Sequence, residues 1–110
     1  MIYSVYRWTA ARDSIAAHEA ALAGLGDHIR ASHPLIQGVR CWKVSFGTEV
    51  ARPGRIWVEI YASWADYETS GKGHSAACDA AWQPVYDTMV PGSMTSAAWE
   101  EAVPGAWFDR

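Results

Sequence analysis

The order of strand-like and helix-like segments constrains the fold of this chain more than any other feature. Two stretches with helical periodicity flank a pair of strand-like stretches, and each end of the chain adds one more strand-like stretch. The 110 residues therefore read β-α-β-β-α-β. This order is typical of a single sheet layer that packs against one layer of helices.

The four strand-like stretches are rich in β-branched and aromatic residues, and turn-forming residues bound them. Gly38 precedes the second stretch, and the turn Arg52-Pro53-Gly54 precedes the third. The expected strands cover residues 2–8, 39–46 and 55–61, with a weaker one at 95–103.

The two helical stretches carry start and stop signals. Asp13 is a suitable N-cap for the first helix, and Pro34 stops it. Its apolar stripe, with one histidine, recurs at steps of three and four and comprises Ile15, His18, Leu22, Leu25 and Ile29. The second helix spans about residues 65–89, and we expect interruptions at 70–73 and at Pro84, because proline cannot donate a backbone hydrogen bond.

These segments predict an α+β fold of the ferredoxin-like, split βαβ type, with a four-stranded antiparallel sheet and both helices on one face. Residues 1–110 would form a single domain, because a chain of this length has no room for a second core.

The third strand suggests how the second face of the sheet is covered. Alternation places Ile56, Val58 and Ile60 on one face, and Trp57, Glu59 and Tyr61 on the other. We expect the aromatic face to point away from the helices and a second copy to cover it, because such a face is poorly suited to water. The sheets of a homodimer would then pack into a dimeric α/β barrel, with an ion pair between Arg7 and Glu59 at its centre.

Charge and composition exclude several classes of function. The net charge is −3 and there is no basic run, so we expect no nucleic-acid partner. No apolar stretch approaches the roughly 20 residues of a spanning helix, so we expect no membrane partner. Cys41 and Cys78 show neither zinc-site nor disulfide spacing, and the chain start lacks the pattern of a signal peptide. A reducing cytoplasm is the expected location.

Three segments carry a resemblance to known proteins. They are Gly38 before the second strand, the run Val58-Glu59-Ile60-Tyr61-Ala62-Ser63-Trp64 leading into the second helix, and Ser70-Gly71-Lys72-Gly73-His74 within it. The chain thereby resembles, over roughly residues 2–103, the dimeric α/β-barrel superfamily. Within it, the antibiotic-biosynthesis-monooxygenase and stress-responsive barrel groups are the most similar.

The resemblance implies a cavity between the helices and the sheet and a broad range of activities. These are cofactor-independent oxygenation of aromatic polyketides and quinols, polyketide cyclisation, lactone isomerisation and haem degradation. Fold alone does not choose among them. Cyclases of the stress-responsive group carry histidines where this chain has Ile2 and Ile56, and its first strand lacks the asparagine that haem-degrading members use.

Two histidines are candidates for acid–base chemistry. His18 lies on the stripe of the first helix, and His74 begins an inward stripe that continues at Cys78. An imidazole titrates near pH 6.5 and can accept the proton that enolisation or quinol deprotonation releases. We expect His74 to be the general base, and a hydrogen-bonded core role is the alternative for both histidines. His28 and His33 are expected to be exposed or capping, and no pair of histidines has metal-site spacing.

Aromatic residues are the second candidate set. Ser4, Tyr6 and Trp8 share the helix-facing side of the first strand if Ile2 faces that way. Tyr6 would bind a substrate carbonyl or phenolate, while Trp8, Trp64, Ser4 and Cys78 would line a flat cavity. Packing in the core is the alternative, because 7 Trp and 5 Tyr are the main core material of this chain.

Together these features predict a small enzyme without cofactor or metal that acts on an aromatic or polyketide-like substrate. The expected activity is that of a monooxygenase in which His74 is the base and His18 and Tyr6 assist. A cyclase, isomerase or lyase with the same base, or a non-catalytic dimer that binds a small ligand, are the alternatives.

Overall fold

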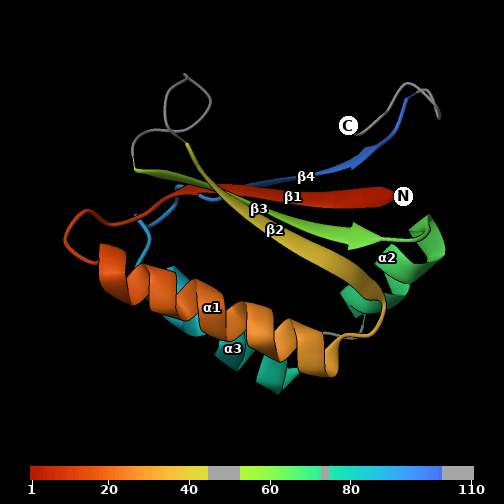
Figure 1. The fold of residues 1–110 in the computed structure, drawn as a ribbon, viewed down its shortest axis with the longest axis horizontal. Helices are drawn as coiled ribbons and strands as arrows, with labels where there is room; N and C mark the ends of the chain where they lie inside the picture. Colours follow the sequence, from red (N-terminus) through yellow and green to blue (C-terminus); the bar gives the residue numbers. More distant parts are fainter. Residues whose placement is uncertain (45–52, 73–74, 103–110) are drawn as a thin grey trace, which may run out of the picture.

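A four-stranded antiparallel sheet with a layer of helices on one side makes up the described part of the chain (Figure 1). The computed structural model describes residues 1–44, 53–72 and 75–102. The strand order is β2-β3-β1-β4, which confirms the ferredoxin-like fold. The elements are β1 (Ile2–Thr9), α1 (Ile15–Ser32), β2 (Ile36–Val44), β3 (Gly54–Tyr61), α2 (Trp64–Lys72), α3 (Ala76–Asp87) and β4 (Thr95–Glu100).

The helical boundaries follow the predicted signals with small differences. The N-cap of α1 is Ser14, one residue after Asp13, and the helix ends before His33 and Pro34. The second helical stretch is divided, as predicted, into α2 and α3. Helix α3 begins after Ser75, whose hydroxyl oxygen accepts a hydrogen bond from the backbone N–H of Cys78 at 3.1 Å.

The predicted interruption at Pro84 is wrong, because α3 continues through this residue to Asp87. Proline removes only one backbone donor from the helix. Its neighbours Trp82 and Val85 are buried, so packing holds the helix in place. The hydroxyl of Thr88 also donates a hydrogen bond to the carbonyl of Pro84 at 2.7 Å.

The predicted orientation of β3 is also wrong. Trp57 lies opposite Tyr6 in the sheet, and its ring centroid is 6.0 Å from that of Trp82 on α3. Trp57, Glu59 and Tyr61 therefore face the helices. Arg7 lies opposite Ile56 and Glu59 lies opposite Ser4, so their side chains leave opposite faces of the sheet. The expected Arg7–Glu59 ion pair is therefore wrong.

The face of the sheet that points away from the helices is nevertheless apolar. It carries Val5, Val58, Ile56 and, on β2, Trp42, which is 51% exposed. The guanidinium of Arg7 lies 5.0 Å from the ring centroid of Trp99 on this face. A second copy that covers this surface remains a prediction, based on different residues from those expected.

The core between sheet and helices is built mainly from aromatic rings. Trp8 and Leu25 are fully buried, and Trp82 of α3 packs edge-on against Trp8 with ring centroids 6.3 Å apart. The helix stripe is confirmed, since His18, Leu25 and Ile29 are the buried residues of α1. Among the described residues, no helix has the length and apolar character needed to cross a membrane.

Candidate functional site

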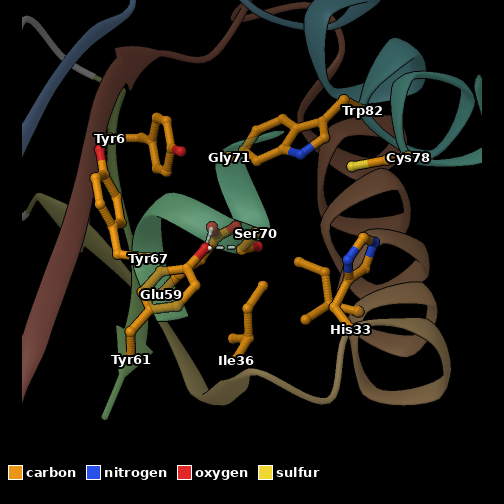
Figure 2. Close-up of a pocket in the computed structure, with 11 residues that line it drawn as sticks. Tyr6, His33, Ile36, Glu59, Tyr61, Tyr67, Ser70, Gly71, Cys78 and Trp82 are labelled. Carbon is orange, nitrogen blue, oxygen red and sulfur yellow. Dashed lines mark hydrogen bonds between the residues drawn. The ribbon is translucent and has the colours of Figure 1, made fainter. Parts of the chain in front are cut away.

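A cavity of about 190 Å³ lies between the helices and the sheet. Strands β1 and β3 supply its floor, and the end of α1 together with α2 and α3 supplies its walls. Figure 2 shows the side chains arranged around a central space, with Tyr6, Tyr67 and Tyr61 on one side and Trp82, Cys78 and His33 on the other. The lining consists of Tyr6, Ile29, His33, Ile36, Glu59, Tyr61, Tyr67, Ser70, Gly71, Cys78 and Trp82.

The carboxylate of Glu59 is the most polar group of this cavity. Its side chain is only 5% exposed, although it lines the space. Trp57 Nε1 donates a hydrogen bond to Glu59 Oε2 at 3.1 Å, and the Tyr61 hydroxyl donates to Oε1 at 3.1 Å. The two donors stand two residues before and after Glu59 on β3, so the pleat of one strand aims all three side chains at the same place. A buried carboxylate with such donors is a positioned proton acceptor.

The negative charge of Glu59 affects the pKa values of the tyrosine and cysteine side chains around it. Burial, with a contribution from the Glu59 charge, raises the pKa of the Tyr6 hydroxyl to about 12. The same two causes raise the pKa of Tyr61. Burial and then Glu59 also raise the pKa of the Cys78 thiol, which is therefore not the thiolate that nucleophilic catalysis needs. The cavity disfavours additional negative charge.

The structure brings two of the predicted site residues, Tyr6 and Cys78, to the cavity. Ser4 is buried on the same face of β1, opposite Glu59, but is not part of the lining. Trp64 is 43% exposed at the start of α2 and donates a hydrogen bond to Glu100 Oε2 at 3.1 Å. Its ring packs against Tyr67, which does line the cavity. His74 lies outside the described residues.

His18 and Trp8 form a separate buried network in the core. Trp8 Nε1 donates a hydrogen bond to His18 Nε2 at 2.8 Å, and His18 Nδ1 lies 2.7 Å from the Thr88 hydroxyl oxygen. An indole N–H can only donate, so His18 is held as the neutral tautomer with its proton on Nδ1. Burial lowers the pKa of His18, Arg55 lowers it further, and Glu19 opposes both. This arrangement matches the alternative of a hydrogen-bonded core histidine.

Glu59 and His33 are among the lining residues that the predicted site did not include. Glu59 was assigned to the opposite face of the sheet, and the cross-strand register that corrects this assignment is not visible in the sequence. His33 was expected to be exposed or capping. It does cap α1, but its ring also lines the cavity, and its Nε2 lies 3.3 Å from Nε2 of His28.

A second, larger hollow adjoins the first. It has a volume of about 600 Å³, runs between α1 and β2, and shares Ile29, His33 and Ile36 with the smaller cavity. In the described ranges, no group of three or more histidine, cysteine, aspartate or glutamate side chains is arranged to hold a metal ion.

The comparisons with known proteins identify the fold. No protein-family model matches the sequence, and no curated protein matches it either. Solved structures do match. A protein of Caulobacter crescentus CB15 named a "putative antibiotic biosynthesis monooxygenase" superposes with a TM-score of 0.69 at 17% identity, over 93% of this chain and 90% of that chain. A protein of the same name from Deinococcus radiodurans gives a TM-score of 0.72 at 11% identity, over 99% and 100%.

A third similar structure, from Jannaschia sp. CCS1, is described as a dimeric ferredoxin-like protein of unknown function. It has a TM-score of 0.68 at 13% identity, over 91% of this chain and 98% of that chain. All three structures superpose on this chain over at least 91% of its length. At identities this low, they show the shared ferredoxin-like fold alone.

Proposed function

We propose that this protein is a small enzyme that oxygenates a phenolic or quinol-type aromatic substrate without a cofactor. The observation that carries the proposal is the buried carboxylate of Glu59 at the floor of a cavity walled by aromatic rings. The fold shared with two proteins named as monooxygenases supports it further.

The size of the cavity favours a small aromatic over a large polyketide at the reacting end. A cavity of about 150 Å³ holds one benzene ring, whereas drug-sized ligands occupy about 300–1,000 Å³. The 190 Å³ available therefore suit one ring. A longer substrate could continue past His33 into the adjoining hollow.

In the proposed reaction Glu59 accepts the phenolic proton, and the Tyr61 hydroxyl holds the carboxylate in position. The ring carbon para to the phenolate oxygen then gives an electron pair to O₂, which forms a C–O bond, and the peroxide takes the proton from Glu59. Loss of the C–H proton and cleavage of the O–O bond release water and leave a carbonyl. The balance is one phenol plus O₂ to one para-quinone plus water, with the substrate as the only reductant.

This assignment of the base differs from the one expected from sequence. His74 remains the alternative base, and matched variants separate the two. Glu59→Gln should reduce turnover by about 10²–10⁴-fold, as usual for loss of a general base. If His74→Gln has this effect and Glu59→Gln does not, the base is His74.

The direct test is oxygen uptake with a panel of monocyclic and bicyclic phenols and hydroquinones, with quinone formation followed by mass spectrometry. We expect oxygen uptake to equal the amount of quinone formed, and we expect the Glu59→Gln variant to lose this uptake. Product without oxygen uptake would identify an isomerase, cyclase or lyase that uses the same base. Binding without turnover across the panel would identify a non-catalytic binding protein.

We also propose that two copies associate through the face of the sheet opposite the helices. The partly exposed Ile56 and Ile60 of β3 and the half-exposed Trp42 of β2 support this arrangement, as does the description of the similar Jannaschia protein as dimeric. The cavity lies on the other side of the sheet, so each copy would carry its own site.

A further inference from the structure

We infer that the larger hollow, between α1 and β2, binds an amphipathic anion: an apolar chain or ring that ends in a carboxylate or a phosphate. The apolar part lies against the inner wall of the hollow, and the charged end pairs with Arg30 and Arg40 at its rim. The inference goes beyond the proposed function, because it concerns binding in the hollow and requires no reaction in the neighbouring cavity.

The hollow is large enough for such a molecule. Its volume of about 600 Å³ falls within the range of about 300–1,000 Å³ that drug-sized ligands occupy. Gly26 of α1 lines it, and a Cβ added at this glycine would meet open space. The missing side chain of Gly26 therefore contributes to the width of the hollow.

The inner wall of the hollow is apolar. Ile29 of α1 is 4% exposed and Trp57 of β3 is 2% exposed, so the deepest part of the wall belongs to the core. Leu22, Ile36 and Val39 are half-buried and complete this wall. An apolar chain that lies against these side chains is removed from water, which is the main source of affinity for such a ligand.

The rim of the hollow carries positive charge from α1. Arg30 follows Gly26 by four residues, so both lie on the same side of the helix. Its side chain is exposed and lines the hollow, whereas Ile29 beside it is buried. The charge thus stands at the solvent side of the apolar wall, which is the arrangement that an amphipathic ligand matches.

Arg40 adds a second positive charge from β2. This strand is an edge of the sheet, and the guanidinium lies at that edge: Nη1 donates a hydrogen bond to the carbonyl of Val39 at 2.9 Å. A Cβ added at Gly38 would lie 3.6 Å from the same nitrogen. Gly38, Val39 and Arg40 all line the hollow.

The guanidinium groups favour a carboxylate or a phosphate as the charged end. A guanidinium is always protonated and presents five N–H donors in a planar fork that fits the oxygens of either anion. The bond to Val39 uses one of the donors of Arg40. An ion pair at an exposed rim is partly screened by solvent, so each arginine should strengthen binding by about 2- to 5-fold.

The test compares three probes with the same alkyl chain: octanoate, octyl phosphate and octanol. Binding is measured by calorimetry at pH 8, where both acids are ionised and an ordinary imidazole is neutral. We expect at least one of the two anions to bind about 5-fold or more tightly than octanol. The difference should shrink at an ionic strength of about 1 M, where charges are screened beyond about 3 Å.

Single charge-removing variants connect this ranking to the arginines. Arg30→Gln and Arg40→Gln should each weaken the tighter anion by about 2- to 5-fold and leave octanol unchanged. Lys43→Gln is the matched control. It removes the same charge from an exposed position on β2 that is outside the lining of the hollow, and it should leave the affinities of all three probes unchanged.

A second pair of variants tests whether the chain lies in the hollow. Gly26→Leu should fill part of the space and weaken all three probes by about 10-fold or more. Gly24→Leu, two residues earlier on α1 and outside the lining, should have no effect. An added Cβ meets open space at both positions, and leucine is a better helix former than glycine, so both variants should fold.

Octanol binding as tightly as both anions would overturn the inference. So would unchanged affinity for the anions in both arginine variants or in folded Gly26→Leu, or the absence of binding of all three probes at millimolar concentration. The tighter of the two anions identifies the charged group. Because the probes contain no phenol, oxygen uptake with phenols would survive failure of this ranking, and the ranking would survive failure of the oxygenase assay.

Discussion

Lowering the pH should destabilise this protein through His18. Both ring nitrogens of this fully buried residue are engaged, Nε2 by the indole N–H of Trp8 and Nδ1 by the hydroxyl of Thr88. A proton added to Nε2 would set two N–H groups against each other and place a charge in the core. The folded state therefore prefers neutral His18, and its pKa is lowered.

The sign and size of the effect follow from linkage. Below about pH 6.5 the unfolded chain binds a proton at this residue that the folded chain does not bind, so the free energy of unfolding falls as the pH falls. The limit is about 1.4 kcal/mol per pH unit, or about 2 kcal/mol between pH 6.5 and 5. We expect about 1 kcal/mol, because the nearby carboxylate of Glu19 favours the protonated form and because solvent screens part of the effect.

The assay is urea unfolding of the wild type and of His18→Gln at four pH values from 5 to 8. At pH 8 the variant should be less stable by about 1–3 kcal/mol, because it leaves part of the Trp8–Thr88 network unsatisfied. This difference should shrink towards pH 5. Because the other histidines titrate in both proteins, their contributions to the pH dependence cancel in the comparison. His28→Gln, on the same helix, serves as a control. A difference that is constant with pH, or a His18 pKa above 6.5 by NMR titration, would refute the reasoning.

Three further predictions test other parts of the molecule. Light scattering should give a mass of about twice 12.1 kDa. Ile60→Asp on the open face of the sheet should produce folded monomers, because an unpaired charge in a buried interface costs several kcal/mol. A monomeric wild type would contradict the dimer. Leu25→Ala should lower the free energy of unfolding in urea by about 2–5 kcal/mol. Leu22 is only half-buried, so Leu22→Ala should lower it by clearly less. Equal losses would contradict the assigned core. Alkylation of Cys78, monitored by mass spectrometry, should be slow at pH 7 and accelerate above pH 9, because burial and the Glu59 charge raise the pKa of the thiol. Rapid modification at pH 7 would show an activated thiolate.

The fold was predictable from the sequence because each element has a clear period and clear boundaries. The stripe of α1 and the break between α2 and α3 are local properties of the chain. The orientation of β3 was not predictable in this way, because both of its faces are apolar and alternation alone does not say which face is inside. The pairing of Tyr6 with Trp57, together with the contact of Trp57 with Trp82 on α3, decides it.

The same limit applies to the candidate site. Tyr6 and Cys78 were found because they lie on inward stripes of single elements. Glu59 was assigned to the wrong face together with the rest of its strand, so its place at the cavity was missed. His18 was placed correctly on the inward face of α1, but its pairing with Trp8 depends on contacts between a helix and a strand that periodicity does not reveal.

Two hydrogen bonds to Glu59 come from Trp57 and Tyr61 of its own strand, whereas Tyr67, Ser70, Cys78 and Trp82 reach the cavity from α2 and α3. The carboxylate and its donors thus form a rigid block within one eight-residue strand. The helical wall could shift outward to admit a ligand, or change in length between related proteins, without displacing that block. Proteins with this strand and a different helical wall should therefore keep the proton acceptor and differ in the size of molecule they admit.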